Sequence, residues 1–407
     1  RQFLRLFTSV MLPMFMAAID QTLLATATPI IAAELGGLRD TSWIAVGYLL
    51  AAAATTPMYG RFGDRFGRRN SLLVALGIFT AGSVACAAAQ SLGMLVAARV
   101  LQGVGGGGLM TLAQALIGEL VTPRERARFQ GYFAAMFSLA SIGGPVIGGL
   151  ILGSLTWPWI FWVTVPVAAV ATVLGMKLVP SDEAPRRRAE FDVLGAVLLV
   201  PCLAAFLLAI TELQTWGPPV IAALVLGVVV LGVAFVARER RTPAPLLDLA
   251  LFRSRAFSGG IVAVLLSYAM LYGIFFVMSF ALVRGYGDTP LSAGLHLVVI
   301  PLALGILAPF AGSWAESRPR AVMLTGMALC FVALVPLRFA LTGDPSTMPV
   351  VLLSLAAYGA GLGLFIAPNN TATLKAAPPE RAGQAGGLLN LLRAFGTATG
   401  IAVMSAV

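Results

Sequence analysis

One carboxylate lies deep inside an apolar stretch of this sequence. Asp20 interrupts "FMAAIDQTLLATATP", residues 15–29, which otherwise has the composition of a membrane-spanning helix. A charged group at bilayer depth is costly, and it is kept mainly where it binds an ion or proton or pairs with another charge. A carboxyl group alternates between ionised and protonated forms, so the chemistry predicted for Asp20 is reversible proton binding. A purely structural carboxylate, paired with a neighbour, is the alternative.

Two arginines also fall inside apolar segments. Arg99 opens "RVLQGVGGGG", residues 99–108, and Arg393 lies in the last segment. Arg99 is expected either to be buried or to extend its side chain to the membrane surface. Arg393 is expected to bind an anionic group or to pair with a carboxylate. Further side chains could face a cavity, although the aromatic ones more often serve packing: Gln21, Gln102, Gln114, Tyr268, Tyr272 and Asn390.

The composition indicates a membrane protein with many spans. The 407 residues are 59% hydrophobic and 11% charged, whereas a soluble domain carries about 25% charged residues. Runs of about 20 apolar residues, long enough to cross a bilayer as helices, recur along the chain. The predicted spans are 6–33, 41–59, 71–89, 92–118, 129–153, 157–178, 192–212, 218–237, 257–283, 291–313, 320–340, 347–370 and 382–407.

The basic residues predict the orientation of the chain. Of the 27 Lys and Arg residues, those in loops fall almost entirely on one side of the predicted membrane, and Arg39, Arg284 and Arg338 are on the other. Cytoplasmic loops are enriched in Lys and Arg, so the amino terminus is expected in the cytoplasm. The net charge of +10 therefore needs no nucleic-acid partner.

The sequence also repeats itself. Gly60, Asp64 and Arg68 recur in the same order and spacing as Gly312, Glu316 and Arg320. Such duplication predicts two similar halves with the substrate site between them. The predicted organisation is a six-helix half over residues 1–178, linkers with two inserted helices at about 192–212 and 218–237 within residues 179–255, and a second half over residues 256–407. Because thirteen spans are visible, we expect a fourteenth outside this chain.

Five stretches together resemble the major facilitator superfamily, in its 14-helix drug:proton antiporter branch. They are "AIDQTLLATATPII" (18–31), "GRFGDRFGRR" (60–69, motif A), "RVLQGVGGGG" (99–108, motif B), "GGPVIGG" (143–149, motif C) and "WPWIFWVTVP" (157–166). The resemblance implies an all-α fold of two six-helix halves plus two inserted helices. It also implies that Asp20 and Arg99 couple transport to protons.

The motifs carry structural expectations as well. Gly60 and Gly63 are predicted to allow a tight turn at a helix end, and motif A as a whole to latch one transport state through Gly60, Gly63, Asp64, Arg65, Gly67 and Arg68. A solvated basic loop is the alternative. Motif C is predicted to form a kinked, closely packed helix through Gly144, Pro145, Gly148 and Gly149. The formal G-x-G-x-x-G at residues 103–108 lies inside a span, which argues against dinucleotide binding.

The function implied by the resemblance is proton-coupled export of amphipathic small molecules such as drugs or antibiotics. The protein is expected to act as a monomer in the bacterial inner membrane, with protons, lipid and substrate as its partners. No cofactor, metal, nucleic acid or enzymatic activity is expected, and the proton gradient would supply the energy. Export of a lipid or secondary metabolite, or uptake by proton symport, remains the alternative.

Overall fold

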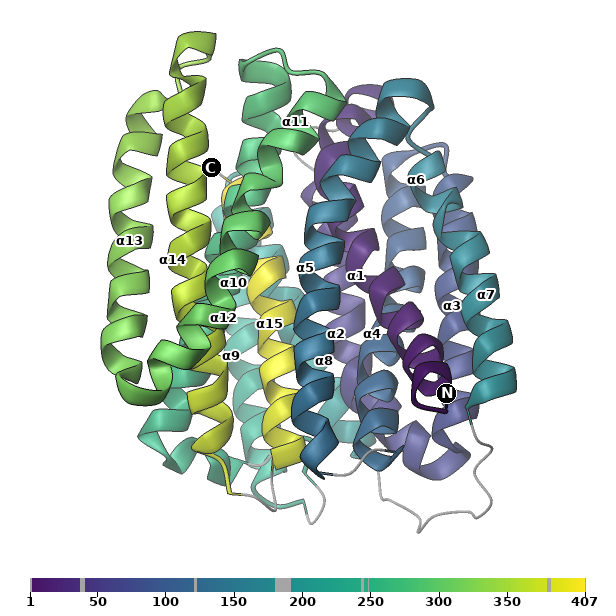
Figure 1. Ribbon diagram of the computed structural model, residues 1–407. Coiled ribbons are helices and arrows are strands. Elements are labelled where there is room, and N and C mark those ends of the chain that lie inside the picture. The colour runs from purple at the N-terminus through teal and green to yellow at the C-terminus, as the bar shows by residue number, and fades with distance from the viewer. Residues whose placement is uncertain are drawn as a thin grey trace.

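The computed structural model describes residues 2–36, 41–120, 123–179, 192–242, 245–247, 249–378 and 382–406. These residues form helices and no strand (Figure 1). The first group of helices is α1 (Gln2–Leu35), α2 (Ser42–Phe66), α3 (Arg68–Ala87), α4 (Leu92–Leu120), α5 (Pro123–Ser154), α6 (Trp159–Trp162) and α7 (Thr164–Leu178).

An inserted hairpin follows, made of α8 (Val193–Thr211) and α9 (Pro218–Glu239). The second group is α10 (Arg255–Phe280), α11 (Pro290–Leu297), α12 (Val299–Ser317), α13 (Pro319–Ala340), α14 (Met348–Lys375) and α15 (Ala382–Ser405). Short 3-10 turns precede α10 and α14 at Leu249–Arg253 and Pro345–Thr347, and a π-helical turn, Ala281–Gly285, extends α10.

Every predicted span corresponds to helix. Within the described residues, ten helical segments are long and apolar enough to cross a membrane, and the bent α1 raises the number to eleven. The apolar stretches of α2 and α5 are shorter, Ser42–Thr56 and Leu139–Ser154. Both helices extend beyond those stretches, since α2 covers Ser42–Phe66 and α5 covers Pro123–Ser154.

Prolines explain the two places where a predicted span divides. The span at 157–178 breaks after Trp162, and the one at 291–313 breaks after Leu297. Pro166 and Pro301 each lie four residues beyond the break. A proline has no N–H to donate to the carbonyl four residues earlier, so the helix is interrupted there.

Glycines bring α4 into close contact with two neighbours. A Cβ atom at Gly103 would lie 2.3 Å from the Tyr48 carbonyl oxygen of α2, and one at Gly105 would lie 2.4 Å from the Phe79 nitrogen of α3. Gly108 faces side chains instead, since its Cβ would lie 2.7 Å from the Ala75 Cβ. The glycine run of motif B therefore sets the distance between α4 and both α2 and α3.

The two groups of helices meet along two seams. α5 packs against α11, and α2 packs against α15. In Figure 1, α11 lies at the upper end of the bundle beside the end of α5. The inserted α8 contacts both groups: Trp43 Nε1 of α2 donates to Glu212 Oε1 at the end of α8 at 3.2 Å, and the Phe206 ring lies 5.4 Å from the Phe395 ring of α15.

Candidate functional site

An ion pair joins Asp20 of α1 to Arg99 of α4. Arg99 Nη1 donates to Asp20 Oδ2 at 2.6 Å, and the two side chains are 0% and 1% exposed. Arg99 Nε also donates to the Ile44 carbonyl of α2 at 3.0 Å. The guanidinium is thus held inside the bundle. The expectation of a buried Arg99 is confirmed, and the alternative, extension to the membrane surface, is wrong.

Gln102, one turn after Arg99, contacts both members of the pair. Its Oε1 accepts from Arg99 Nη1 at 2.5 Å, and its Nε2 donates to Asp20 Oδ1 at 2.9 Å. Nε2 also donates to Ser83 Oγ of α3 at 2.8 Å. Gly82 allows this approach, because a Cβ there would lie 2.5 Å from the Gln102 Cα.

Aromatic rings cover the arginine. The Arg99 Cζ atom lies 4.4 Å from the centre of the Tyr48 ring and 5.8 Å from that of the Phe161 ring. Both aromatic side chains are buried. A cation over an aromatic face gains about 2 kcal/mol or more when it is desolvated. The rings therefore stabilise the guanidinium while they keep it away from lipid and water.

A small cavity connects this network to the second half of the bundle. Its volume is about 20 Å³, which is room for little more than one water molecule. Residues from five helices line it: Gln21 and Leu24 of α1, Ala45, Tyr48 and Leu49 of α2, Arg99 of α4, Tyr272 of α10, and Thr397 and Ile401 of α15. The sequence-predicted candidates Gln21, Arg99 and Tyr272 therefore meet at one place.

Motif C places α5 between α1 and α11. A Cβ at Gly148 would lie 2.3 Å from Thr26 Oγ1 of α1, and one at Gly149 would lie 2.7 Å from the Leu291 Cα of α11. Pro145 lies on the α11 side, where its carbonyl oxygen would be 2.2 Å from a Cβ at Gly294.

The first glycines of motif C differ from each other. A Cβ at Gly144 would lie 2.0 Å from Thr22 Oγ1, a hydroxyl that donates to the Ala140 carbonyl of α5 at 2.9 Å. Gly143, by contrast, would make only ordinary contacts at 3.8 Å or more. The close packing predicted for this motif therefore begins at Gly144.

The helix that carries Asp20 bends next to this contact. α1 changes direction by 58° between Val10–Leu24 and Thr26–Leu35. Pro29 lacks the N–H that would pair with the carbonyl of residue 25, where the bend lies. Asp20 therefore lies just over one turn before a bend in its own helix.

Motif A is organised differently from the prediction. α2 runs through residues 60–66, so Gly60 and Gly63 lie in the helix and the turn is at Gly67, whose φ is 88°. Gly63 serves packing instead, since its Cβ would lie 2.9 Å from Leu112 Cδ2 of α4. Arg68 Nη1 donates to the Ala115 carbonyl of α4. The structure does not describe the side chains of Asp64 and Arg65 or the surroundings of Gly60.

The remaining candidates form a second group on α10 and α15. Arg393 stacks near Tyr268, while Asn390 precedes it by one turn on α15. The side chain of Gln114 lies outside the described residues.

Sequence reasoning missed three residues of the site, Tyr48, Ser83 and Thr397. Each could have been found as a polar side chain within an otherwise apolar span.

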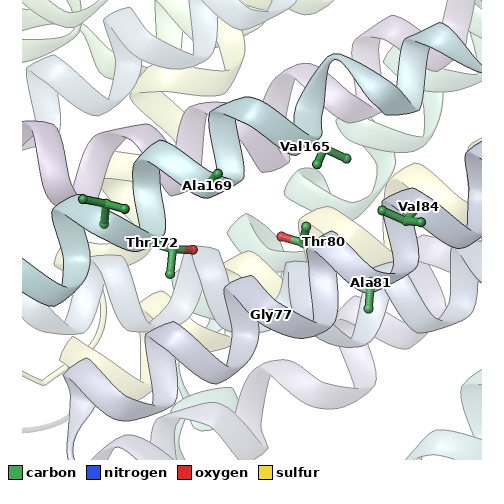
Figure 2. Close-up of a pocket in the computed structure, with 8 residues that line it drawn as sticks. Gly77, Thr80, Ala81, Val84, Val165, Ala169 and Thr172 are labelled. Atoms are coloured by element: carbon green, nitrogen blue, oxygen red, sulfur yellow. The ribbon is translucent and has the colours of Figure 1, made fainter.

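A second cavity lies elsewhere, as a groove between α3 and α7 (Figure 2). Its volume is about 710 Å³, and Thr80 and Thr172 face it from opposite walls. Both hydroxyls donate to carbonyls of their own helices, at 2.7 and 2.8 Å. The lining residues Gly77, Ala81, Val84, Ala169 and Val173 are exposed, so this is an apolar groove on the outside of the bundle.

Comparison with known proteins gives a consistent result. The family described as Major Facilitator Superfamily matches residues 10–401. The riboflavin transporter RibZ of Clostridioides difficile is 29% identical over 96% of this chain and 85% of its own length. A multidrug resistance protein B homolog of Mycobacterium tuberculosis is 30% identical over 96% of this chain and 73% of its own length. The crystal structure of a D-xylose-proton symporter, 14% identical, superposes with a TM-score of 0.68 over 99% of this chain and 89% of that one.

Proposed function

Because the chain belongs to the major facilitator superfamily and is a multi-pass membrane transporter, we propose that it exports amphipathic small molecules in exchange for protons. Asp20 is the group that binds and releases the proton. Arg99 and Gln102 are its partners, and the cavity between the two groups of helices is where substrate passes. The amino terminus lies in the cytoplasm, as the distribution of basic residues suggests.

The observation that carries this proposal is the buried Asp20–Arg99 pair beside a cavity shared by both halves. An ionised Asp20 balances the charge of Arg99, whereas a protonated Asp20 leaves that charge without a counterion. An uncompensated buried charge is strongly destabilising. Proton binding would therefore favour a different arrangement of α1 and α4, in which Arg99 finds another acceptor or becomes hydrated.

The packing of α5 offers a route from that change to the other half. Thr22, two residues after Asp20, donates to the Ala140 carbonyl of α5. α5 in turn contacts α11 through Gly149 and Pro145 without intervening side chains. Movement of α1 around Asp20 would thus be passed to the α5–α11 seam. Packed interfaces of this kind tend to switch between discrete arrangements, which suits alternating access.

The relatives support a transport function but do not agree on a substrate. One relative is named for multidrug resistance and another for riboflavin transport. A dedicated metabolite carrier is therefore the second candidate. A drug exporter and a dedicated metabolite carrier differ in how many kinds of substrate they transport, and one assay can measure this.

The test is transport in proteoliposomes that carry a pH gradient and a pH-sensitive dye. Three probes cover the charge classes: ethidium (cation), riboflavin (neutral) and dansylglycine (anion). We expect gradient-driven probe movement that is accompanied by counter-movement of protons, and its loss in Asp20→Asn. Asp344→Asn, which changes an exposed loop carboxylate, should behave like the unmodified chain.

Two outcomes would overturn the proposal. Proton movement that persists in Asp20→Asn would remove Asp20 from the coupling role. Probe movement in the same direction as protons would replace export with symport. Response to riboflavin alone would favour the dedicated metabolite carrier.

A further inference from the structure

A second arginine lies at the seam between the halves. Arg393 is in the middle of α15 and is half-buried. Its Cζ atom lies 4.9 Å from the centre of the Phe137 ring of α5 and 5.9 Å from that of the Tyr268 ring of α10. The guanidinium therefore lies close to two aromatic rings, one from each half.

This arginine differs from Arg99 in its partners. Arg99 contacts a carboxylate, an amide and a backbone carbonyl. Among the described residues, the Arg393 guanidinium has no hydrogen bond and no ion pair. Its five N–H groups are thus available, because stacking on a ring uses the face of the guanidinium and leaves its edge open.

Among the side chains that the structure describes in the second half, no carboxylate pairs with Arg393. Asp288 and Asp344 lie in loops, and Glu316 lies near the end of α12, where its side chain is outside the described residues. Asp288 Oδ2 lies 2.7 Å from His296 Nδ1, and Asp344 accepts from the Ser346 amide. A charged side chain within a membrane bundle that has no protein partner marks a substrate or ion path.

The neighbouring residues connect Arg393 to the cavity. Tyr272 and Thr397, which line the cavity, follow Tyr268 and Arg393 by four residues on α10 and α15. Residues four apart lie on the same face of a helix. A ligand whose anionic group binds Arg393 can therefore extend along this face into the cavity beside Tyr272. In the present conformation the cavity is small, so the halves must part to admit it.

From this arrangement we infer that Arg393 binds the carboxylate of aromatic organic acids, so that the substrates of this transporter include amphipathic anions. The planar guanidinium fork matches a carboxylate with two parallel hydrogen bonds. The Phe137 and Tyr268 rings provide apolar faces for the aromatic part. This inference rests on the proposed transport function, since it assigns a substrate class to the same central path.

The experiment compares an acid with its amide on the purified chain in lipid nanodiscs, without a pH gradient. Dansylglycine and dansylglycinamide differ only in the carboxylate, and their fluorescence reports binding. We expect the chain to bind the acid more tightly. Arg393→Gln should weaken acid binding by roughly tenfold or more, as loss of a charged hydrogen bond implies, and leave the amide unchanged. Arg393→Lys should retain part of the preference.

Arg284→Gln is the matched control. Arg284 also stacks on an aromatic ring, Phe280 at 5.6 Å, but it is exposed in the turn that ends α10. This variant should keep the preference for the acid. Inorganic phosphate at millimolar concentration should compete poorly, because it lacks the aromatic part.

Two results would overturn the inference: equal binding of acid and amide by the unmodified chain, or an equal loss of both in Arg393→Gln. The second would mean that Arg393 only maintains packing. Binding is measured without a gradient, so it is independent of proton coupling. If Asp20→Asn retains proton coupling while Arg393→Gln loses the preference for the acid, the proposed role of Asp20 fails and the anion site stands.

Discussion

Asp20 and Gln102 contact each other and share Arg99 as a common partner, so the three side chains form a closed ring of hydrogen bonds. The charge of Asp20 is balanced by Arg99, and Gln102 donates to one and accepts from the other. Two further bonds tie the ring to its neighbours, from Gln102 Nε2 to Ser83 Oγ of α3 and from Arg99 Nε to the Ile44 carbonyl of α2. A change at any one member therefore alters the environment of all the others.

A double-mutant cycle tests this coupling. Arg99→Ala alone should lower the unfolding free energy by about 3–5 kcal/mol, because it leaves a buried carboxylate unpaired. Asp20→Asn together with Arg99→Ala should lower it by less than the sum of the single changes. Thermal unfolding of the purified variants in one detergent measures both effects. Additive losses would show that the two residues do not interact.

Motif C offers a test of close helix contact. In Gly148→Ala, the new methyl group would lie 2.3 Å from Thr26 Oγ1 and 3.2 Å from the Leu23 carbonyl oxygen. Overpacking of this kind costs about 1–3 kcal/mol, so we expect reduced stability and slower transport in vesicles. Thr26→Ala removes the closest atom, and the double variant should recover most of both losses.

Gly143→Ala is the control for that experiment, since its methyl group would meet nothing closer than 3.8 Å. It should be as active and as stable as the unmodified chain. A similar defect in Gly143→Ala would point to backbone flexibility rather than helix contact. Failure of Thr26→Ala to rescue Gly148→Ala would argue against the contact itself.

Asp192, just before α8, gives a prediction about pH. Burial raises its pKa, but the Gly195 amide, Arg238 and Thr242 all donate to the carboxylate, and the net pKa lies below its ordinary value. A lowered folded-state pKa stabilises the protein above the unfolded-state pKa of about 4, and this stabilisation disappears as the pH falls through the lower value. The stability gap between the unmodified chain and Asp192→Asn should be constant near neutral pH and close in strong acid. Thermal unfolding at a series of pH values measures it, and a gap that widens in acid would contradict the assignment.

The contact between α2 and α8 predicts how the inserted hairpin is held. Trp43→Phe removes the donor to Glu212, a carboxylate that is 7% exposed. Leaving a buried acceptor unpaired costs about 1–3 kcal/mol. We expect a lower unfolding temperature that Glu212→Leu partly restores in the double variant. If Glu212→Leu instead adds to the loss, the hydrogen bond is not what holds α8 to α2.

Apolar runs were sufficient to predict the helices, because span length and charge distribution are local properties of the sequence. The breaks after Trp162 and Leu297 were missed, although Pro166 and Pro301 signal them. The turn at Gly67 was assigned to Gly60 and Gly63 because a glycine's type does not distinguish a turn from a close helix contact. Only the neighbours of each glycine separate the two roles.

The site was predictable in part. Asp20 and Arg99 stood out because charges are rare within spans, but their pairing depends on how α1 and α4 pack, which no local pattern specifies. Tyr48 and Ser83 were overlooked because each is common as a packing residue. Phe137 lies in the opposite half from Arg393, and such long-range contacts cannot be obtained from spacing along the chain.

The glycines of α4 bear on how this sequence can diverge. Every substitution at Gly103 or Gly105 adds a Cβ that meets backbone atoms of Tyr48 or Phe79, and no change of the facing side chain can relieve that. Gly108 faces the Ala75 methyl group and the Tyr59 ring, so a larger residue there can be accommodated by a smaller partner. Among homologues, position 108 should therefore covary with positions 59 and 75, while positions 103 and 105 remain invariant.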